Sequence, residues 1–406
     1  ILLNTTSNLS SFINDKRFRS FFFQISIIVL VGLSFFWLVS NTLENLENRG
    51  KSLGFSFLST QSGFEISDTL GTWLFSYEVG VSTYLDVYYI GIANTFVVAA
   101  IGIFFATILG FSVGIMRLSK NVVIRFFATI YVEFLRNTPL LLQLFFWYFA
   151  VLRALPGRRE KMEIIGDTVA INIAGLYLPA PIPEQGFGMF CFVCLFAIVL
   201  TFVSSWFFRS KQMETGKIYP VFGINLFILL AIPSIAFLLL NNPLSWSIPE
   251  FSNTGPILKR GFQSGTGMVV VPEMIAVLLA LSLYTAAFIA EIVRAGILAV
   301  HKGQTEAALS LGLRPNITLR LVIIPQALRV IIPPLTSQFL NLTKNSSLAV
   351  AIAYPELVSI FAGTALNQAG KEIEMIAMMM AVYLTFSILT SVYMNWFNSR
   401  VKLVEK

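Results

Sequence analysis

The feature that most constrains this chain is a series of long apolar runs. A helix needs about 20 consecutive apolar residues to cross the hydrocarbon core of a bilayer. Runs of that length recur along the chain and predict about eight transmembrane helices. They cover residues 22–43, 88–116, 124–152, 188–208, 221–240, 271–295, 330–353 and 375–397.

The composition excludes an ordinary soluble domain. Only 12% of the 406 residues are charged, whereas 56% are apolar and 38 are Phe. Soluble domains have about a quarter of their residues charged. The sequence therefore predicts an all-α integral membrane protein whose main surroundings are lipid. The net charge of +7 is modest and shows no clustered basic face, so we expect no nucleic-acid partner.

The distribution of Lys and Arg orients the predicted spans. With a cytoplasmic N-terminus, the cytoplasmic segments carry nearly twice as many Lys and Arg residues as the opposite side. This places the N-terminus, the C-terminus and the loop 303–325 in the cytoplasm. The first run is longer than a signal-peptide core and lacks a small-residue cleavage site, so we expect it to remain as an anchor. The segments 153–185 and 241–270, on the other side, hold Pro and Gly turn signals and predict small ordered caps.

The cytoplasmic loop has the pattern of two short helices separated by a turn. The stretch "TEAALSLG" is rich in helix formers, and we expect a helix that begins at Gln304 or Thr305. Gly312 is suited to end that helix in a left-handed conformation, and Pro315 is suited to the first turn of the next one. Pro325 and the pair Pro333-Pro334 are expected to break or kink the entry into the following span.

The same loop resembles a known motif. Glu306, Ala307, Ala308, Gly312 and Pro325 stand at the spacing of the EAA loop of ABC-importer permeases, with Val322 and Ile324 as conservative departures. In that family the loop is a coupling helix that contacts the ATP-binding subunit. The resemblance implies that the segment 306–312 transmits ATP-driven movement. A plain surface helix that covers the bundle is the alternative.

A wider resemblance covers most of the chain. The stretches "YVEFLRNTPLLLQLFF" and "NLTKNSSLAVAIAYPEL" look like segments of polar amino-acid permeases. The whole resembles the larger permease of the general L-amino-acid and glutamate/glutamine/aspartate/asparagine transporters, with a five-helix core and extra helices. The implied parts are a cytoplasmic tail 1–21, an anchor and extracytoplasmic segment 22–87, core residues 88–152, an insertion 153–270, core residues 271–399 and a tail 400–406.

The resemblance also implies partners in a bacterial inner membrane. These are a dimeric ABC ATP-binding subunit, a second and distinct permease, and a periplasmic amino-acid-binding protein. A homodimer of permeases remains an alternative. The sequence has no phosphate-binding G-x-x-x-x-G-K-[ST] loop, so ATP and Mg are expected on the partner ATPase, with no cofactor and no ATPase site in this chain.

Polar groups inside the spans are candidates for function, because they are costly there. Glu133 and Arg136 are spaced to pair on one helix, as are Glu291 and Arg294. A second set is predicted to line the amino-acid path. Its members are Asn137, Thr138, Gln143, Asn341, Lys344, Asn345, Ser346 and Ser347.

Lys344 has two interpretations. It lies ten residues beyond Pro334, about 15 Å along a regular helix. Its ammonium group there can pair with a substrate carboxylate. The alternative is a structural ion pair with Glu133 or Glu291.

Three further residues or pairs have plainer interpretations. We expect Glu356 to be solvated at the outer face; contact with the binding protein is the alternative. His301 is predicted to be a solvated loop residue. Cys191 and Cys194 are predicted to be small apolar residues, and no metal site or catalytic residue is expected.

Two other classes of function must be weighed. An ion-coupled secondary transporter or channel for polar solutes explains the spans and Lys344 but leaves Glu306 to Pro325 without a role. A membrane-embedded enzyme is disfavoured, because the spans hold no cluster of His, Cys or carboxylates. An ATP-driven importer of polar L-amino acids, working by alternating access, is the function that the sequence favours.

Overall fold

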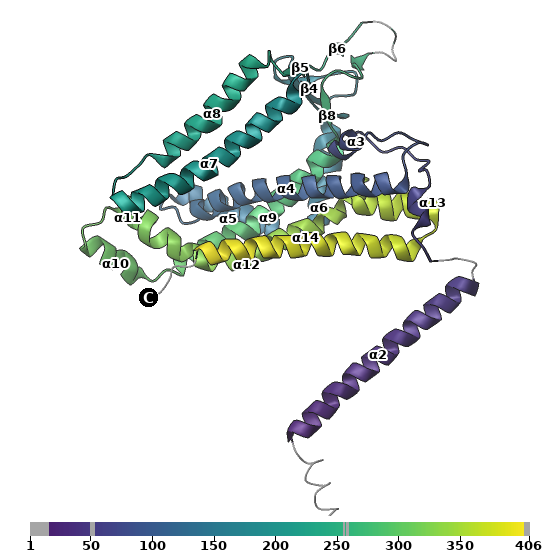
Figure 1. The fold of residues 1–406 in the computed structure, drawn as a ribbon, viewed down its shortest axis with the longest axis horizontal. Helices are drawn as coiled ribbons and strands as arrows, with labels where there is room; N and C mark the ends of the chain where they lie inside the picture. The colour runs from purple at the N-terminus through teal and green to yellow at the C-terminus, as the bar shows by residue number, and fades with distance from the viewer. Residues whose placement is uncertain (1–15, 49–52, 255, 257–259, 402–406) are drawn as a thin grey trace, which may run out of the picture. The chain divides into compact units, whose positions relative to one another are not determined.

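The computed structural model describes residues 16–48, 53–254, 256 and 260–401 (Figure 1). The ends of the predicted cytoplasmic tails, 1–15 and 402–406, lie outside the described residues. The chain divides into two compact units, residues 1–58 and 59–406. In the first unit, α2 (Lys16–Asn48) is an apolar helix whose described side chains are nearly all exposed. An anchor in lipid has this character, because its apolar side chains need no protein core.

Seven helices among the described residues are long and apolar enough to cross a membrane. They confirm seven of the eight predicted spans. Besides α2 they comprise α4 (Tyr84–Met116), α7 (Phe187–Thr215), α8 (Val221–Leu239), α9 (Pro272–Leu298), α12 (Ile324–Asn345) with the helical turns around it, and α14 (Glu372–Val401).

The remaining predicted span, 124–152, is divided. It forms α5 (Val122–Asn137) and α6 (Leu140–Phe145), followed by the π-helical η2 (Phe146–Val151) and the 3-10 turn η3 (Leu152–Ala154). Pro139 lies at the break. Because proline lacks an N–H and restricts the preceding residue, Thr138 adopts an extended conformation and the helix ends. The sequence predicts a kink at Pro139, and in the structure the interruption there is a full break between two helices.

The core of the second unit is a bundle in which α4 packs closely on α9 (Figure 1). Small residues recur at every fourth position of α4: Gly102, Ala106, Gly110 and Gly114, all buried. A Cβ atom at Gly110 would lie 2.5 Å from Cβ of Ile289. Without a hydrophobic driving force between helices in lipid, such small residues allow the backbones to approach and gain van der Waals contact.

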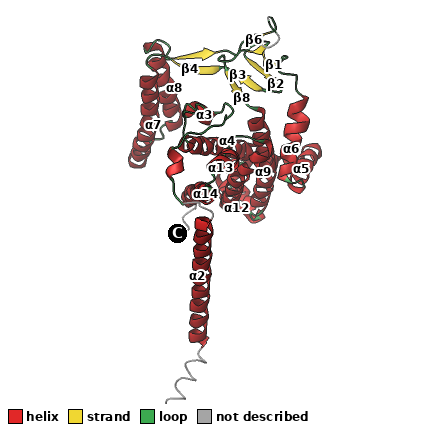
Figure 2. Cartoon of the chain, turned by 90° about the vertical axis from the view of Figure 1, so that its right-hand side faces the viewer, coloured by secondary structure: helices red, strands yellow, loops and turns green. Residues whose placement is uncertain are grey.

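The strands of the insertion form a cap, shown in yellow in Figure 2. One antiparallel sheet has the order β1 (Met162–Ile165), β2 (Val169–Asn172), β3 (Gly175–Leu178) and β8 (Met268–Val270). Two smaller pairs join β4 (Ala180–Pro183) to β5 (Leu244–Ser247) and β6 (Phe251–Ser252) to β7 (Gly261–Phe262). The predicted ordered cap is thus confirmed. Its strands are an addition to the mostly helical fold that the composition predicts.

The helices α7 and α8 form a hairpin that packs mainly on itself. Within it, Asn225 donates a hydrogen bond of 2.6 Å to the Ser205 hydroxyl. The strands β4 and β5 close the open end of the hairpin, with Pro183 opposite Leu244. The two extra helices are therefore a peripheral element whose ends lie side by side.

The short helical elements complete the fold. They are η1 (Ser56–Ser59), α3 (Leu70–Leu74), α10 (Lys302–Ser310), α11 (Pro315–Thr318), the π-helical η5 (Leu319–Ile323), the 3-10 η6 (Ser346–Ile352), the π-helical η7 (Val358–Ala365) and α13 (Leu366–Ala369).

Candidate coupling helix and membrane path

The predicted cytoplasmic loop folds into α10 and α11 at one end of the bundle (Figure 1). Gly312 ends α10 with a φ of 77°, as its sequence position predicts. The N–H of Gly312 donates to Leu309 O at 2.9 Å, and the N–H of Leu313 donates to Ala308 O at 3.1 Å. These two bonds form a Schellman motif, which satisfies carbonyls at the helix end and fixes where it stops.

The start of α10 differs from the prediction. The helix begins at Lys302, because His301 accepts a hydrogen bond of 3.1 Å from the N–H of Gly303 through its Nδ1 atom. His301 is exposed, as expected, and is also the N-cap of the helix. A histidine is an uncommon N-cap, so a search for Ser, Thr, Asp or Asn misses it.

The side chains of α10 divide into a buried and an exposed set. Ala308 is buried, whereas Glu306 and Ala307 are exposed, and Leu311 just beyond the helix is 82% exposed. Gln326 of α12 donates to Gln304 at 3.1 Å and ties α10 to the next span. The result is a short rod, held on one side by the bundle, that presents a carboxylate and apolar atoms to the outside.

The prolines around α12 act less strongly than expected. Pro315 lies in the first turn of α11, as predicted, and Pro325 lies in the first turn of α12. The helix then continues through Pro333 and Pro334, so neither residue ends it. The π-helical turn η5 immediately precedes Pro325, and such turns are common where the regular hydrogen-bond ladder is interrupted.

The break at Pro139 brings together three of the predicted path residues. Asn137 donates to Glu133 O at 2.7 Å, and Thr138 donates to Phe134 O at 2.8 Å. The buried Gln143 donates to Leu135 O at 2.9 Å and to Thr138 O at 3.0 Å. The three side chains thus bond carbonyls around the break, which is how non-helical backbone is tolerated at membrane depth.

The other five predicted path residues lie at a second break in regular helix. Asn341 and Lys344 are exposed near the end of α12, Asn345 is its last residue, and Ser346 and Ser347 begin η6. The segment η6 contacts α6, which carries Gln143. The fold therefore brings the elements that carry the two groups into contact. Within the described residues, Lys344 forms no ion pair with Glu133 or Glu291, which contradicts the structural alternative.

The charged residues of the spans form one network instead of two separate pairs. Glu291 lies 2.5 Å from Arg294, as predicted, and Arg136 approaches it at 3.9 Å. Arg117 also bonds Glu291 and lies 3.6 Å from Glu133. The predicted pairing of Glu133 with Arg136 is wrong, because each pairs with a residue of another helix.

Arg117 is a site residue that the sequence analysis missed. It caps the C-terminus of α4, and its side chain is only 10% exposed. In the sequence it stands just after an apolar span and resembles an ordinary cytoplasmic flank. Its side chain joins α4 to Glu133 of α5 and Glu291 of α9, so it connects three helices of the bundle.

Glu356 is buried, which contradicts the predicted solvated position. It is 0% exposed and follows the span that ends at Ile352. Its carboxylate accepts hydrogen bonds from the N–H groups of Val358 and Ser359, each at 2.8 Å, and from the Tyr383 hydroxyl at 3.0 Å. Burial raises the pKa of Glu356 to about 7, against the lowering effect of these three bonds.

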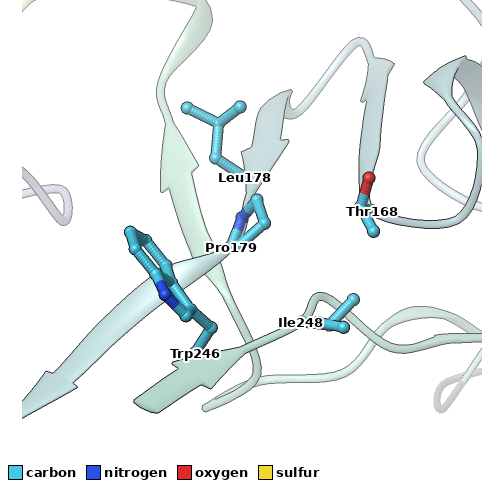
Figure 3. Close-up of a pocket in the computed structure, with 5 residues that line it drawn as sticks. All are labelled: Thr168, Leu178, Pro179, Trp246 and Ile248. Carbon is cyan, nitrogen blue, oxygen red and sulfur yellow. The ribbon is translucent and has the colours of Figure 1, made fainter. Parts of the chain in front are cut away.

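The cap formed by the strands of the insertion carries a shallow apolar hollow (Figure 3). Its lining residues come from the strands and turns of the insertion and include no predicted site residue. The Trp246 side chain, 60% exposed, lies at its edge. The lining is Thr168, Leu178, Pro179, Trp246 and Ile248.

The cysteines show no sign of a bound metal ion. Within the described residues, no group of three or more His, Cys, Asp and Glu side chains is placed to hold one. Cys191 is exposed and Cys194 is partly exposed on α7, and both are free thiols.

Comparison with known proteins identifies the family. The profile of the family described as "Binding-protein-dependent transport system inner membrane component" matches residues 215–403. The chain is 47% identical to YhdX of Escherichia coli (strain K12), whose name assigns it to the amino-acid ABC transporter permeases, over 99% of each chain. It is 45% identical to the general L-amino acid transport system permease protein AapQ of Rhizobium johnstonii, over 97% of this chain and 94% of AapQ.

A third relative agrees. The glutamate/glutamine/aspartate/asparagine transport system permease protein BztB of Rhodobacter capsulatus is 40% identical, over 98% of this chain and 97% of BztB. Since all three alignments run over nearly the full length, the likeness includes the insertion as well as the core. With its helices and its inner-membrane family, this chain belongs to the amino-acid ABC transporter permeases and is a multi-pass inner-membrane protein.

Proposed function

We propose that this permease imports polar L-amino acids with energy from ATP that a separate subunit binds and hydrolyses. The observation that carries the proposal is α10. It is a rod of fixed length, ended by Gly312, with Glu306 and Ala307 exposed at the end of the bundle. A surface of this kind suits insertion into a groove of a partner, and the resemblance of its sequence to the EAA loop favours an ATPase as that partner.

The substrate class follows from the relatives. AapQ is named for general L-amino acids and BztB for glutamate, glutamine, aspartate and asparagine. We infer that this chain takes the same class, delivered by a periplasmic amino-acid-binding protein. A second permease, either distinct or a second copy, completes the membrane part, and a dimer of ATP-binding subunits holds ATP and Mg.

The path through this chain is proposed to run past the two helix breaks. Lys344 supplies an ammonium group that can pair with the amino-acid carboxylate, and the polar side chains near Gln143 and Ser346 offer hydrogen bonds. Movement of α10 is transmitted to the path through α12, because α12 follows directly after η5 and carries Lys344 at its other end. The network of Arg117, Glu291 and Arg294 holds α4 and α9 together during this movement.

The proposed orientation has both termini and α10 in the cytoplasm. The excess of Lys and Arg on that side supports it, as does the position of the last turns of α14 at the same end of the bundle as α10 (Figure 1). The proposed parts of the chain are those that the sequence predicts. In the insertion 153–270, the strands lie on the extracytoplasmic side, α7 and α8 cross the membrane, and the turn between them lies in the cytoplasm. Reporter fusions after Lys217 and after Ser252 are expected to lie on opposite sides of the membrane.

The test is transport by the whole complex in proteoliposomes. The permease is purified with its native partners, and uptake of labelled glutamate and glutamine is measured with the binding protein outside and ATP inside. We expect uptake to require ATP and to be unaffected when ion gradients are collapsed. Uptake that follows a proton or sodium gradient without ATP would indicate an ion-coupled transporter instead.

A variant pair locates the coupling surface. Glu306→Ala is expected to reduce ATP-dependent uptake about tenfold, because a charged group at an interface contributes strongly to binding. Asn316→Ala changes another exposed residue of the same loop, on α11, and is expected to leave uptake unchanged. Equal effects of the two variants would contradict the assignment of α10 as the coupling surface.

A further inference from the structure

The five residues between η6 and η7, 353–357, form a buried segment that neither the sequence analysis nor the proposed path explains. Tyr354 is 1% exposed, and Glu356 and Leu357 are 0% exposed. The segment follows directly after η6, which begins at Ser346. The contacts that hold residues 353–357 in place therefore also hold the end of η6, which belongs to the proposed path.

Glu356 satisfies the backbone where the chain turns into η7. Its two carboxylate oxygens accept the N–H groups of Val358 and Ser359, the first donors of that helix. Donors at the start of a helix have no partner within the helix, so a carboxylate there is both a hydrogen-bond acceptor and a favourable charge. The third bond, from Tyr383, comes from α14 and ties the segment to a different span.

The start of the proposed path segment is buried beside this clamp. Ser346, the first residue of η6, is 1% exposed, and its hydroxyl donates to Thr343 O at 2.7 Å. Thr95 of α4 accepts the N–H of Leu357 at 3.1 Å. The residues that follow η6 are thus bonded to α4 as well as to α14.

Helix α4 holds the other side of the segment. Asn94 donates to Pro355 O at 2.7 Å and accepts the N–H of Gly71 of α3 at 3.0 Å. A Cβ atom at Gly91 would lie 2.9 Å from Cα of Leu357, so the two backbones are in direct contact. The segment is therefore clamped between α4 and α14 by buried polar bonds.

The clamp holds a conformation that the backbone does not prefer. Ala353, at the end of η6, has a φ of 59°, in the left-handed region that non-glycine residues seldom adopt. Such a residue persists only when its surroundings determine its conformation. The N–H groups of Ala353 and Tyr354 donate to Val350 O at 3.1 Å and to Ala349 O at 3.2 Å, and the bonds of Asn94 and Glu356 hold the residues that follow.

We propose that Glu356 is a positioning residue that, through its bonds to the start of η7 and to Tyr383 of α14, holds the end of η6 in the geometry that substrate passage requires. The proposal rests on the proposed function, because it assigns η6 to the path. Glu356 does not itself contact the substrate. It keeps the path segment from relaxing when α10 moves α12, so that each ATP hydrolysed moves substrate.

The experiment measures amino-acid uptake and ATP hydrolysis together in proteoliposomes that contain the whole transporter. It is carried out at pH 8, so that the carboxylate is ionised. Tyr383→Phe keeps the ring and removes the hydroxyl that joins Glu356 to α14. Glu356→Gln keeps the shape and replaces one acceptor oxygen by a donor. Both variants are expected to lower uptake per ATP hydrolysed about tenfold, as the loss of a hydrogen bond to a charged group predicts.

The matched control is Tyr88→Phe. The Tyr88 hydroxyl donates to Met378 O at 3.2 Å, so it also joins α4 to α14, but it does not contact Glu356. This variant is expected to keep the uptake per ATP of the unaltered transporter. A purely structural role would lower the amount of assembled complex, and with it uptake and hydrolysis together, without changing their ratio.

The outcomes are distinct. An unchanged ratio in Tyr383→Phe overturns the proposal, and so does an equal fall in Tyr88→Phe. If Glu356→Gln fails to assemble, Tyr383→Phe decides alone, because its ring packing is preserved. Absence of ATP-dependent uptake by the unaltered complex would overturn the proposed function itself, which is a different result from intact transport with unchanged variants.

Discussion

Glu291 shows how single residues hold this bundle together. Three arginines approach it, from the end of α4, from α5 and from its own helix. A buried charge is tolerated only when its partners replace the water it has lost. The partner that comes from α4 is the one with the least exposed side chain, and it is therefore expected to matter most for stability.

We expect Arg117→Gln to lower the free energy of unfolding by about 1–3 kcal/mol, because it leaves the carboxylates of Glu133 and Glu291 short of a charged partner. Thermal unfolding of the purified permease in detergent measures the change. Arg125→Gln, which alters an exposed arginine near the same helix end, is the control and is expected to change stability by less than about 0.5 kcal/mol. Equal effects would show that Arg117 is no more than a surface charge.

Glu356 predicts a dependence of stability on pH. Burial raises its pKa from 4.5 to about 7, so the folded state holds the proton more tightly than the unfolded state. The stabilisation from this group is therefore fully present below pH 4.5 and is lost as the pH rises through about 7. A shift of this size corresponds to roughly 3 kcal/mol.

The measurement compares apparent melting temperatures of the unaltered permease and of Glu356→Gln between pH 4.5 and 8. The difference between the two proteins isolates Glu356 from other titrating groups. We expect the melting temperature of the unaltered protein to fall relative to that of the variant as the pH rises. A constant difference across this range would mean that the carboxyl group titrates outside it.

For single residues, the sequence indicates which side chains are important better than it indicates which other residues they contact. Glu291 and Arg294 are neighbours on one helix turn, so their pair follows from spacing. The bonds of Arg117 to α5 and α9 depend on how three helices meet, and no local pattern records that. Glu356 was expected in solvent because the stretch "AYPEL" is typical of the end of a membrane span. Its burial arises instead from contacts of this segment with α4 and α14.

Among the elements, α10 is the one that the sequence specifies most completely. Helix-forming residues followed by a glycine determine where it ends, and the Schellman motif at Gly312 confirms that prediction. The divided third span is a contrast. Pro139 predicts a kink within residues 124–152, but a full break between two helices also depends on nearby side chains that can satisfy the freed carbonyls.

We expect Gly312→Ala to weaken binding of the ATPase subunit about fivefold. The left-handed conformation of residue 312 costs about 1 kcal/mol or more when the residue has a Cβ atom. We therefore expect the end of α10 to fray, so that the helix no longer ends at a fixed residue. Gly312→Asn is the control, because asparagine also serves at this helix position. Affinity is measured by titrating the ATPase subunit onto the reconstituted permease pair, and a stronger loss with Asn than with Ala would contradict the explanation.

The whole molecule combines a tightly packed bundle with a loosely attached hairpin. The helices α4 and α9 meet through small residues, whereas α7 and α8 pack mainly on each other. Composition predicts that all of them lie in the membrane but cannot tell which contacts are close, because apolar residues face lipid and protein alike. The spacing of small residues on α4 is the sequence signal for the close contact.

The hairpin is expected to be removable. The N–H of Glu184 donates to Pro243 O at 3.0 Å, so the two ends of the segment 185–242 already lie together. Replacing that segment by Asn-Gly, a two-residue hairpin turn, should leave β4 and β5 paired. We expect the shortened chain to insert and to assemble with its partners in at least about half the normal amount, since few contacts with the bundle are lost.

Quantitative co-purification of the partner subunits from membranes checks this expectation. Replacement of residues 162–178 by the same dipeptide is the comparison, because it removes three strands of the sheet that contains β8. That deletion should reduce assembly more strongly. If the hairpin deletion is the more damaging of the two, then α7 and α8 hold the complex together and are not peripheral.

The strand β8 leads after a single residue into α9. A sheet on one side of the bilayer is thereby fused to a rod of 27 residues, about 40 Å long, whose far portion bears Glu291 and Arg294. A stiff arm of that length turns a small rocking of its outer end into a lateral displacement at its inner end. A force applied to the sheet would therefore reach Glu291 and Arg294 through α9 itself, without passing through a loop.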